Sequence, residues 1–264
     1  MLNPNPYSLT LTSVVSVGTT AVPVRTDLPF DEGKIEGKEK TMKKIVFVLF
    51  CFIFATGAVA IAAQRDLEIQ GKKLIFQKPP VTVTLPSEFN LVHSFSHENP
   101  RENSLTRVYF LVKTKGKQVE EMLILQIADK TNPQAGPMTV APLKPYAEEK
   151  MYLKGRFKKG GLESDYLIQL MTWNPEAPSL QPVMKKGLIL PSHWALQGQF
   201  LFLFQGEHAV FFRYSKDINS FGIKVSEKGE DWEKGIVSGN EKKICETFQK
   251  TFMEMMASIQ IESP

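Results

Sequence analysis

The sequence predicts an α+β domain in which a mainly antiparallel sheet is covered by helices and a C-terminal amphipathic helix ends the fold. Short alternations of apolar and polar residues, separated by turn residues, predict the strands. The run Phe200–Phe204 (FLFLF) is apolar at every position, which is typical of a strand covered on both faces. Apolar residues at helical spacing over Ser238–Ile259 predict the closing helix.

Residues Met42–Ala63 have the composition of a signal peptide. Lys43 and Lys44 form a positive start, Ile45–Phe54 is densely apolar, and Ala58–Ala63 offers small-residue cleavage sites. The competing interpretation is a retained N-terminal membrane anchor, because about 18 or more uncharged apolar residues can cross a bilayer. Both interpretations keep the lysines inside and place the following chain outside the cytoplasm. We therefore expect an extracytoplasmic protein, periplasmic or secreted, with an inner-membrane-anchored form as the alternative.

Residues 1–41 precede this segment and show no periodic apolar pattern. Their content of Thr, Ser, Val, Pro and Gly is typical of a disordered extension. A second hypothesis is that they are not translated and that synthesis starts at Met42. Glu36–Glu39 (EGKE) can be encoded by purine-rich codons, as a ribosome-binding site would be. Residues 64–264 are then predicted to form a single α+β domain, because their length suits one hydrophobic core.

Charge and cysteine content narrow the possible partners. The formal net charge is +4 and no basic block stands out, so we expect no nucleic-acid partner. The two cysteines are Cys51, inside the export segment, and Cys245. After cleavage Cys245 has no disulfide partner within the chain, so the fold depends on its apolar core. We expect contact with a membrane only through residues 42–63, if they are not cleaved.

The first part of the domain is predicted to be β-structure. Three short strands are predicted, at Lys73–Phe76, Val81–Leu85 and Asn90–Ser96. Alternation within the third strand places Leu91, His93 and Phe95 on one face. Thr106–Lys113 and Glu121–Ala128 flank a Lys-Gly-Lys turn and are predicted to form a hairpin.

Two proline-rich stretches interrupt the middle of the domain. Asp129–Pro145 holds four prolines and cannot be a central strand, because proline has no amide hydrogen to donate. A loop of this length is either a binding loop or a passive excursion. A short helix is predicted at Tyr146–Leu153, directly after this stretch. The second proline-rich stretch holds Pro175, Pro178 and Pro182, and we predict strands on either side of it, at Asp165–Trp173 and Lys186–Leu190.

The last third carries the strongest patterns. Phe200–Phe204 and Ala209–Tyr214 flank a four-residue turn and are predicted to form a second hairpin. Ser238 and Glu241 have capping-box spacing at the start of the closing helix. One face of that helix carries Ile244, Phe248, Phe252, Met255, Met256 and Ile259. We interpret this stripe as docking against the sheet, with an oligomer interface as the alternative.

Few residues carry recognisable chemistry. His93 and His97, next to Glu98, would suit a metal on a helix, but on a strand they lie about 13 Å apart, so we expect no metal site. Cys245 lies on the apolar side of its helix and is predicted to be a buried structural thiol rather than a nucleophile. The chain has no G-x-S-x-G, phosphate-binding glycine loop or paired-cysteine motif, so no catalytic residue and no cofactor is predicted.

Trp173 and Trp194 are the predicted ligand-binding residues. They flank the second proline-rich loop, where two large aromatic side chains could line a pocket. Packing of both rings in the core is the alternative.

The order of elements resembles one protein family. The segment VTVTLPSEF (residues 81–89) near the start and KKICETFQKTFMEMMASI (residues 242–259) at the end are similar to the PsbP and Mog1-like group. That resemblance implies an α/β/α sandwich and a role as a binding or assembly protein. It carries no functional residue over to this chain.

Together these observations predict an exported, non-enzymatic envelope protein that binds an unknown protein or small molecule. An exported hydrolase-type enzyme, whose residues converge only in the fold, is the alternative. A membrane-anchored structural protein is the third possibility. A clustered, partly buried set of His, Asp or Glu in a pocket would favour the enzyme, and a broad exposed aromatic patch would favour the binding protein.

Overall fold

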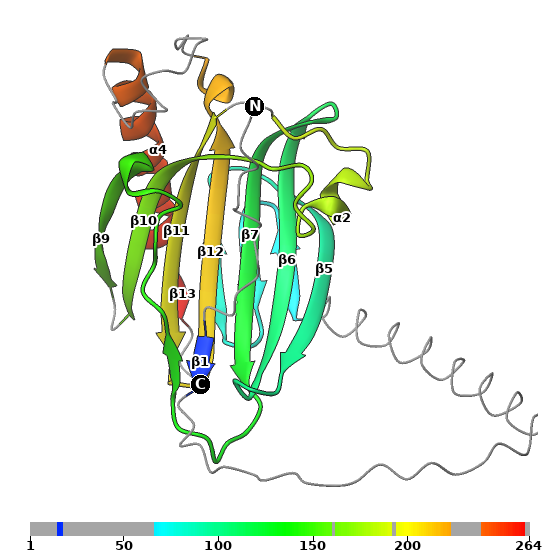
Figure 1. Cartoon of the computed structure of the whole chain (residues 1–264), viewed down its shortest axis with the longest axis vertical. Coiled ribbons are helices and arrows are strands. Elements are labelled where there is room, and N and C mark those ends of the chain that lie inside the picture. The colour runs from blue at the N-terminus through cyan, green and yellow to red at the C-terminus, as the bar shows by residue number, and fades with distance from the viewer. Residues whose placement is uncertain (1–14, 18–65, 160–161, 192–193, 223–238, 262–264) are drawn as a thin grey trace, which may run out of the picture.

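The fold consists of a large and a small antiparallel sheet with one long helix between residues 239 and 257 (Figure 1). The computed structural model describes residues 15–17, 66–159, 162–191, 194–222 and 239–261. The predicted export segment and the predicted extension, apart from residues 15–17, lie outside the described residues.

The large sheet has seven strands in the order β5-β6-β7-β12-β11-β10-β9, and every neighbouring pair is antiparallel. In chain order the strands are β5 (Asn90–Asn99), β6 (Ser104–Lys115), β7 (Gln118–Lys130), β9 (Met151–Lys159), β10 (Leu162–Thr172), β11 (Trp194–Phe204) and β12 (His208–Asp217). Both predicted hairpins are therefore confirmed, with longer strands than the sequence indicated. Strands β5 and β9 form the two edges (Figure 1).

The small sheet has four short strands in the order β13-β4-β3-β2. They are β2 (Leu67–Gln70), β3 (Lys73–Phe76), β4 (Val81–Thr84) and β13 (Gln260–Ile261). A separate pair joins β1 (Val15–Val17) to β8 (Met138–Val140), which lies inside the first proline-rich stretch. The small sheet thus joins the start of the domain to its last described residues.

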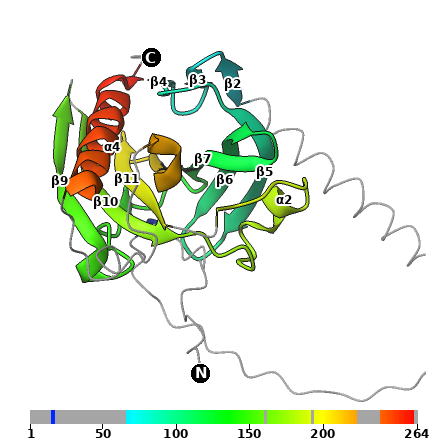
Figure 2. The same ribbon diagram turned by 90° about the horizontal axis from the view of Figure 1, so that it is seen from above.

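The inner face of the large sheet is covered by helix α4 (Gly239–Ala257) and by the small sheet, which lie side by side in Figure 2. Successive residues of a strand point to opposite faces, so Leu123, Leu125 and Ile127 of β7 all point inward. They join α4 and the small sheet in one buried cluster. The predicted docking of the helical stripe against the sheet is confirmed, because every residue of that stripe is buried in this cluster.

Gly198, in the middle of β11, lets α4 approach the sheet closely. A Cβ atom at this position would lie 2.5 Å from the ring of Phe252. Phe252 also packs against Phe200, with ring centroids 5.9 Å apart. The glycine therefore provides the space that the aromatic side of the helix occupies.

The outer face shows why the predicted fold class is wrong. The sequence predicts helices over the sheet, but on the inner side α4 shares the cover with a second, smaller sheet. On the outer side the one-turn helix α2 (Gln181–Met184) packs against the sheet, and strand β8 and loop residues among those described provide further cover. Leu201 of the FLFLF run is buried against Leu143 of the first proline-rich stretch. An apolar run indicates that a strand is covered, but it does not indicate what covers it.

Two further element predictions are wrong. Tyr146–Leu153 is not a helix: a 3₁₀ turn, η1 (Glu148–Lys150), leads directly into edge strand β9. Lys186–Leu190 forms no strand and contributes a single bridge, from Ile189 to Gln118. In the first segment Tyr152 and Leu153 belong to β9 and pack against the inner cluster. In the second segment Leu188 and Leu190 pack on the outer side, whereas Ile189 is 52% exposed.

We predict that Gly198→Ala lowers the free energy of unfolding by about 1–3 kcal/mol, because the added methyl group overpacks the contact with Phe252. Urea unfolding followed by far-UV circular dichroism measures the change. Adding Phe252→Leu to the same chain should recover part of the loss. Equal stability of Gly198→Ala and the wild type would mean that α4 does not sit on this glycine.

Candidate functional site: a charged cavity between the two sheets

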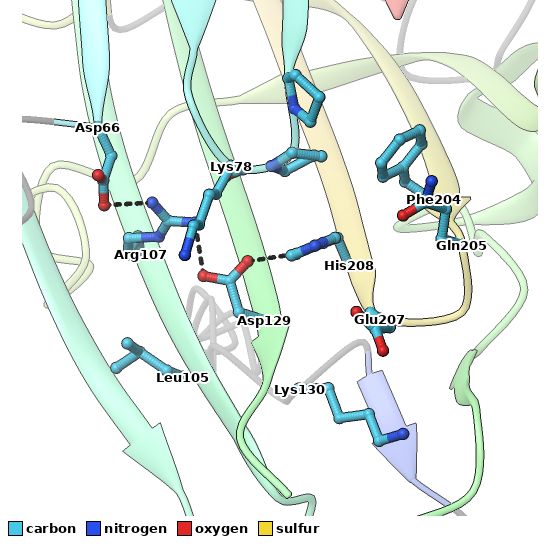
Figure 3. A pocket seen from close by; sticks show the side chains of 12 residues that line it. Asp66, Lys78, Leu105, Arg107, Asp129, Lys130, Phe204, Gln205, Glu207 and His208 are labelled. Carbon is cyan, nitrogen blue, oxygen red and sulfur yellow. Dashed lines mark hydrogen bonds and ion pairs between the residues drawn. The ribbon is translucent and has the colours of Figure 1, made fainter. Parts of the chain in front are cut away.

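A cavity of about 620 Å³ lies where the small sheet meets one end of the large sheet (Figure 3). The small-sheet side contributes Asp66, Lys78, Pro79 and Pro80. The large-sheet side contributes Leu105, Arg107, Asp129, Lys130, Phe204, Gln205, Glu207 and His208. The volume is within the range of about 300–1,000 Å³ that small-molecule sites occupy.

The strand register brings four of these residues into one row. Leu105 pairs with Asp129, Asp129 pairs with His208, and Phe204 pairs with His208. Directly paired residues point to the same face of a sheet, and this row continues the inward stripe of each strand. The inner face is therefore apolar along its middle and becomes polar at this end.

Arg107 lies at the centre of the site and is 4% exposed. Its Nη1 atom is 2.5 Å from Asp66 Oδ2, and its Nη2 atom is 2.5 Å from Asp129 Oδ2. Nη2 also donates to the carbonyl oxygen of Lys78 at 2.7 Å. These bonds join the large sheet to both ends of the β2–β3 hairpin, because Asp66 precedes β2 and Lys78 follows β3.

Asp129 links this arginine to a histidine. Its second oxygen, Oδ1, lies 2.7 Å from Nδ1 of His208 (Figure 3). Both side chains are about four-fifths buried, so the pair is only partly solvated. A carboxylate at Nδ1 fixes the orientation of the imidazole ring and leaves Nε2 as its second polar atom. This is the geometry of an oriented proton acceptor.

Tyr109 sits behind the arginine, fully buried. Burial raises the pKa of its phenol above the ordinary value, and the neighbouring Arg107 charge only partly opposes that rise. The phenol therefore stays protonated at neutral pH. The formal charges in the cavity are those of Lys78, Arg107 and Lys130 against those of Asp66, Asp129 and Glu207.

The arrangement suits recognition of a polar molecule. The buried charges already have partners, so the cavity is organised before any ligand arrives. Phe204 and Leu105 add apolar surface beside them. No Ser, Thr or Cys is among the described residues that line the cavity, so the histidine and aspartate have no hydroxyl or thiol to activate there.

A second polar cluster lies at the opposite end of the inner face. Glu121 is 2% exposed and accepts hydrogen bonds from Ser87, Lys113 and Tyr214 at 3.0, 2.9 and 2.8 Å. Burial alone would raise the pKa of Glu121, but these hydrogen bonds and the charge of Lys216 lower it below the ordinary value. The cluster therefore stabilises the fold at neutral pH and loses that contribution as the pH falls through the lowered pKa. Because its groups are mutually satisfied, we interpret it as structural.

The structure places Trp173 and Trp194 in different hydrophobic clusters. Trp173 is 5% exposed and packs with α2 on the outer side, whereas Trp194 packs against the inner cluster and carries Lys150 Nζ 4.4 Å from its ring centroid. Neither ring lines the cavity between the sheets. A ligand pocket formed by these two rings stays a prediction.

His93 and His97 lie on the outer side of edge strand β5, with Phe95 between them. A bulge between Leu91 and His93 shifts the register, so the prediction that Leu91 shares a face with His93 and Phe95 is wrong. Over the described part of the chain, no group of three or more His, Cys, Asp or Glu side chains could hold a metal ion.

Cys245 is fully buried in the inner cluster. Burial, together with the charges of Glu241 and Glu246, raises the pKa of its thiol to about 12. The thiol is therefore protonated and inert at neutral pH, as a structural role requires.

Sequence reasoning missed the residues that form the cavity. The sequence predicts Asp129 at the start of a loop and His208 in a turn, and it predicts no role for Arg107. A signal was present: the inward stripes of β6, β7 and β12 end in charged or titratable residues, with Arg107, Asp129 and His208 at one end. Recognising that signal requires the strand order, because the three strands are separated in the sequence.

Comparison with known proteins gives no relative: no family model, no curated protein and no solved structure matches the chain. The resemblance to the PsbP and Mog1-like group stays a prediction, and the helix-covered sandwich that it implied is not the fold observed. Among the described residues no helix is both long enough and apolar enough to cross a bilayer.

We predict that Arg107→Ala lowers the free energy of unfolding by about 3–5 kcal/mol, because it leaves two carboxylates without their buried partner. Chemical unfolding with a fluorescence readout measures the loss. Arg156→Ala is the matched control, since Arg156 also pairs with two carboxylates, Glu163 and Asp165, but its side chain is 61% exposed. The control should unfold close to the wild type. Equal effects of the two changes would contradict a structural role for the buried network.

Proposed function

We propose that the protein is an exported binding protein whose polar small-molecule ligand occupies the cavity between the two sheets. The observation that carries this proposal is the Asp66–Arg107–Asp129–His208 network, which is buried except at Asp66 and lines a cavity of ligand size. Such charges are costly to bury, and here they are fixed in position by both sheets. Export is inferred from the composition of residues 42–63, and ligand binding is inferred from the cavity.

The ligand should carry groups of both polarities. Lys78 and Lys130 offer cationic donors, Glu207 and the outer oxygen of Asp66 offer acceptors, and Phe204 offers an aromatic face. The balance of charges favours a neutral or zwitterionic molecule over a strongly anionic one. A molecule with several hydroxyl, amide or amino groups meets these requirements.

A second candidate, hydrolysis, is favoured by one contact. The 2.7 Å pair of His208 and Asp129 could take a proton from a bound water molecule. Clustered, partly buried His and Asp side chains in a cavity are also the feature expected of the enzyme alternative. We rank this candidate second, because no nucleophilic side chain lines the cavity among the described residues.

We predict that screening polar metabolites by thermal shift finds ligands that bind this cavity. A ligand at about 100 times its Kd should raise the free energy of unfolding by about 2.7 kcal/mol. Leu105→Trp fills the cavity and should abolish the shift. Ile189→Trp is the matched control, because Ile189 is 52% exposed and lies outside the cavity. Stabilisation that survives in Leu105→Trp would contradict the site.

The same ligands distinguish the two candidates. A binding protein leaves each bound molecule unchanged, as mass spectrometry of the recovered ligand would show. A hydrolase converts it, and His208→Gln then stops conversion while binding persists. Conversion that depends on His208 would replace the first candidate by the second.

We predict that the protein recovered from fractionated cells is soluble, extracytoplasmic and begins near Ala63 or Gln64. N-terminal sequencing and intact mass measure the cleavage site. A membrane-bound species that retains Met42–Ala63 would show the anchored alternative instead. Any peptide from residues 1–41 would contradict the hypothesis that translation starts at Met42.

A further inference from the structure

The outer face of the large sheet carries a positive charge that no neighbour balances. Arg213 is half-buried at the centre of β12, and its guanidinium lies 4.5 Å from the ring centroid of Phe211. Within the described residues it forms no ion pair with any carboxylate. This contrasts with Arg107, which has two carboxylate partners on the inner face.

The register shows which groups surround Arg213. Across the sheet it pairs with Gln199 on β11 and Ile124 on β7. Its diagonal neighbours on the same face are Met122, Gln126, Gln197 and Leu201, and along the strand it lies between Phe211 and Ser215. None of these residues is acidic. Asp165, the acid of the Leu201 row, lies on the next strand and pairs with Arg156.

The loop above this face does not supply a negative charge either. The backbone N–H group of Tyr146 donates to Gln169 Oε1 at 2.8 Å, and its phenol interacts with the side chain of Gln197 and with the charge of Arg213. Burial raises the pKa of the Tyr146 phenol, so the phenol is neutral at physiological pH. Burial also lowers the pKa of Arg213, in keeping with a guanidinium that lacks a compensating anion. A half-buried charge without a partner is costly to the folded chain.

We propose that Arg213 anchors a carboxylate-binding site on the outer face, separate from the cavity between the sheets. The planar guanidinium matches a carboxylate in a two-point contact, and the Phe211 ring holds that plane in position. The amides of Gln126 and Gln199 lie beside it as additional polar groups. One positive charge balances one carboxylate, so a monoanion fits better than a phosphate dianion.

The site serves either of two sources of a carboxylate: a small organic acid, or the free C-terminus of a peptide. Both present the same planar anion to Arg213.

The test uses the full chain and titrates it with benzoate and with acetyl-trialanine, following the Arg213 Nε–H signal by NMR. Benzamide and acetyl-trialanine amide are the uncharged controls. We expect a saturable shift with at least one of the two acids and none with its amide. Saturation by benzoate identifies the small-acid source, and saturation by the peptide alone identifies a peptide terminus. No saturable shift with either acid overturns the proposal, as does tighter binding of inorganic phosphate.

Two variants separate binding from stability. Arg213→Gln should weaken the affinity at least about tenfold, as expected for loss of a charged hydrogen-bonded pair. Arg156→Gln changes an arginine that already has partners and should leave the affinity unchanged. Without added carboxylate, Arg213→Met should have a melting temperature equal to or above that of the wild type, because it removes an unbalanced charge. A lower melting temperature, or unchanged affinity in Arg213→Gln, would assign Arg213 a purely structural role.

Discussion

The rest of the structure depends on the contact between helix α4 and the centre of the large sheet. Phe252 reaches the backbone at Gly198, and Phe248 stacks on Tyr214 with centroids 5.4 Å apart. Burying a phenylalanine side chain stabilises a fold by roughly 1.5–3 kcal/mol, and several aromatic rings meet here. The helix covers only part of the inner face, however, so the remainder must be covered by something else. The small sheet covers the remainder of the inner face, and the cavity lies where the small sheet meets one end of the large sheet.

Beside the apolar cluster that the two sheets share, charged groups also join them at that boundary. Arg107 needs its carboxylate partners, because a buried guanidinium or carboxylate without a partner lowers the stability of the fold. Its bonds to Asp66, Asp129 and the Lys78 carbonyl therefore fix the position of the β2–β3 hairpin relative to the large sheet. The same bonds position His208 through Asp129. A network that is rigid for structural reasons is also a prearranged set of polar groups for a ligand.

Much of the strand content could be predicted from the sequence, and the helix cover could not. Period-two alternation located β4, and apolar runs on either side of short turns located the two hairpins, because both patterns report which side chains are buried. These patterns do not indicate whether a helix, a sheet or a loop covers a strand. The apolar run that contains Leu201 therefore did not predict that Leu143, from a proline-rich stretch, packs on it. The sequence predicts a helix at Tyr146–Leu153, but the structure has a 3₁₀ turn at Glu148–Lys150 and begins edge strand β9 at Met151. At an edge, one row of hydrogen-bonding groups faces solvent and fewer side chains need burial.

The candidate site was hidden for a related reason. His208 and Asp129 lie 79 residues apart and meet only because β12 pairs with β7 rather than with a strand that follows it. Within its own strand, each of the two is a polar residue at the end of an apolar stripe, and such a position normally predicts a side chain exposed to solvent. Read across the sheet, they form a row with Leu105 and Phe204 that the small sheet then partly covers. The two faces thus differ at their central arginines. On the inner face Arg107 has two carboxylate partners. On the outer face Arg213 has no carboxylate partner among the described residues, and the Tyr146 phenol that interacts with it is neutral. The chain itself supplies the anions that Arg107 needs. An added carboxylate is therefore expected to stabilise the protein more at Arg213 than at Arg107.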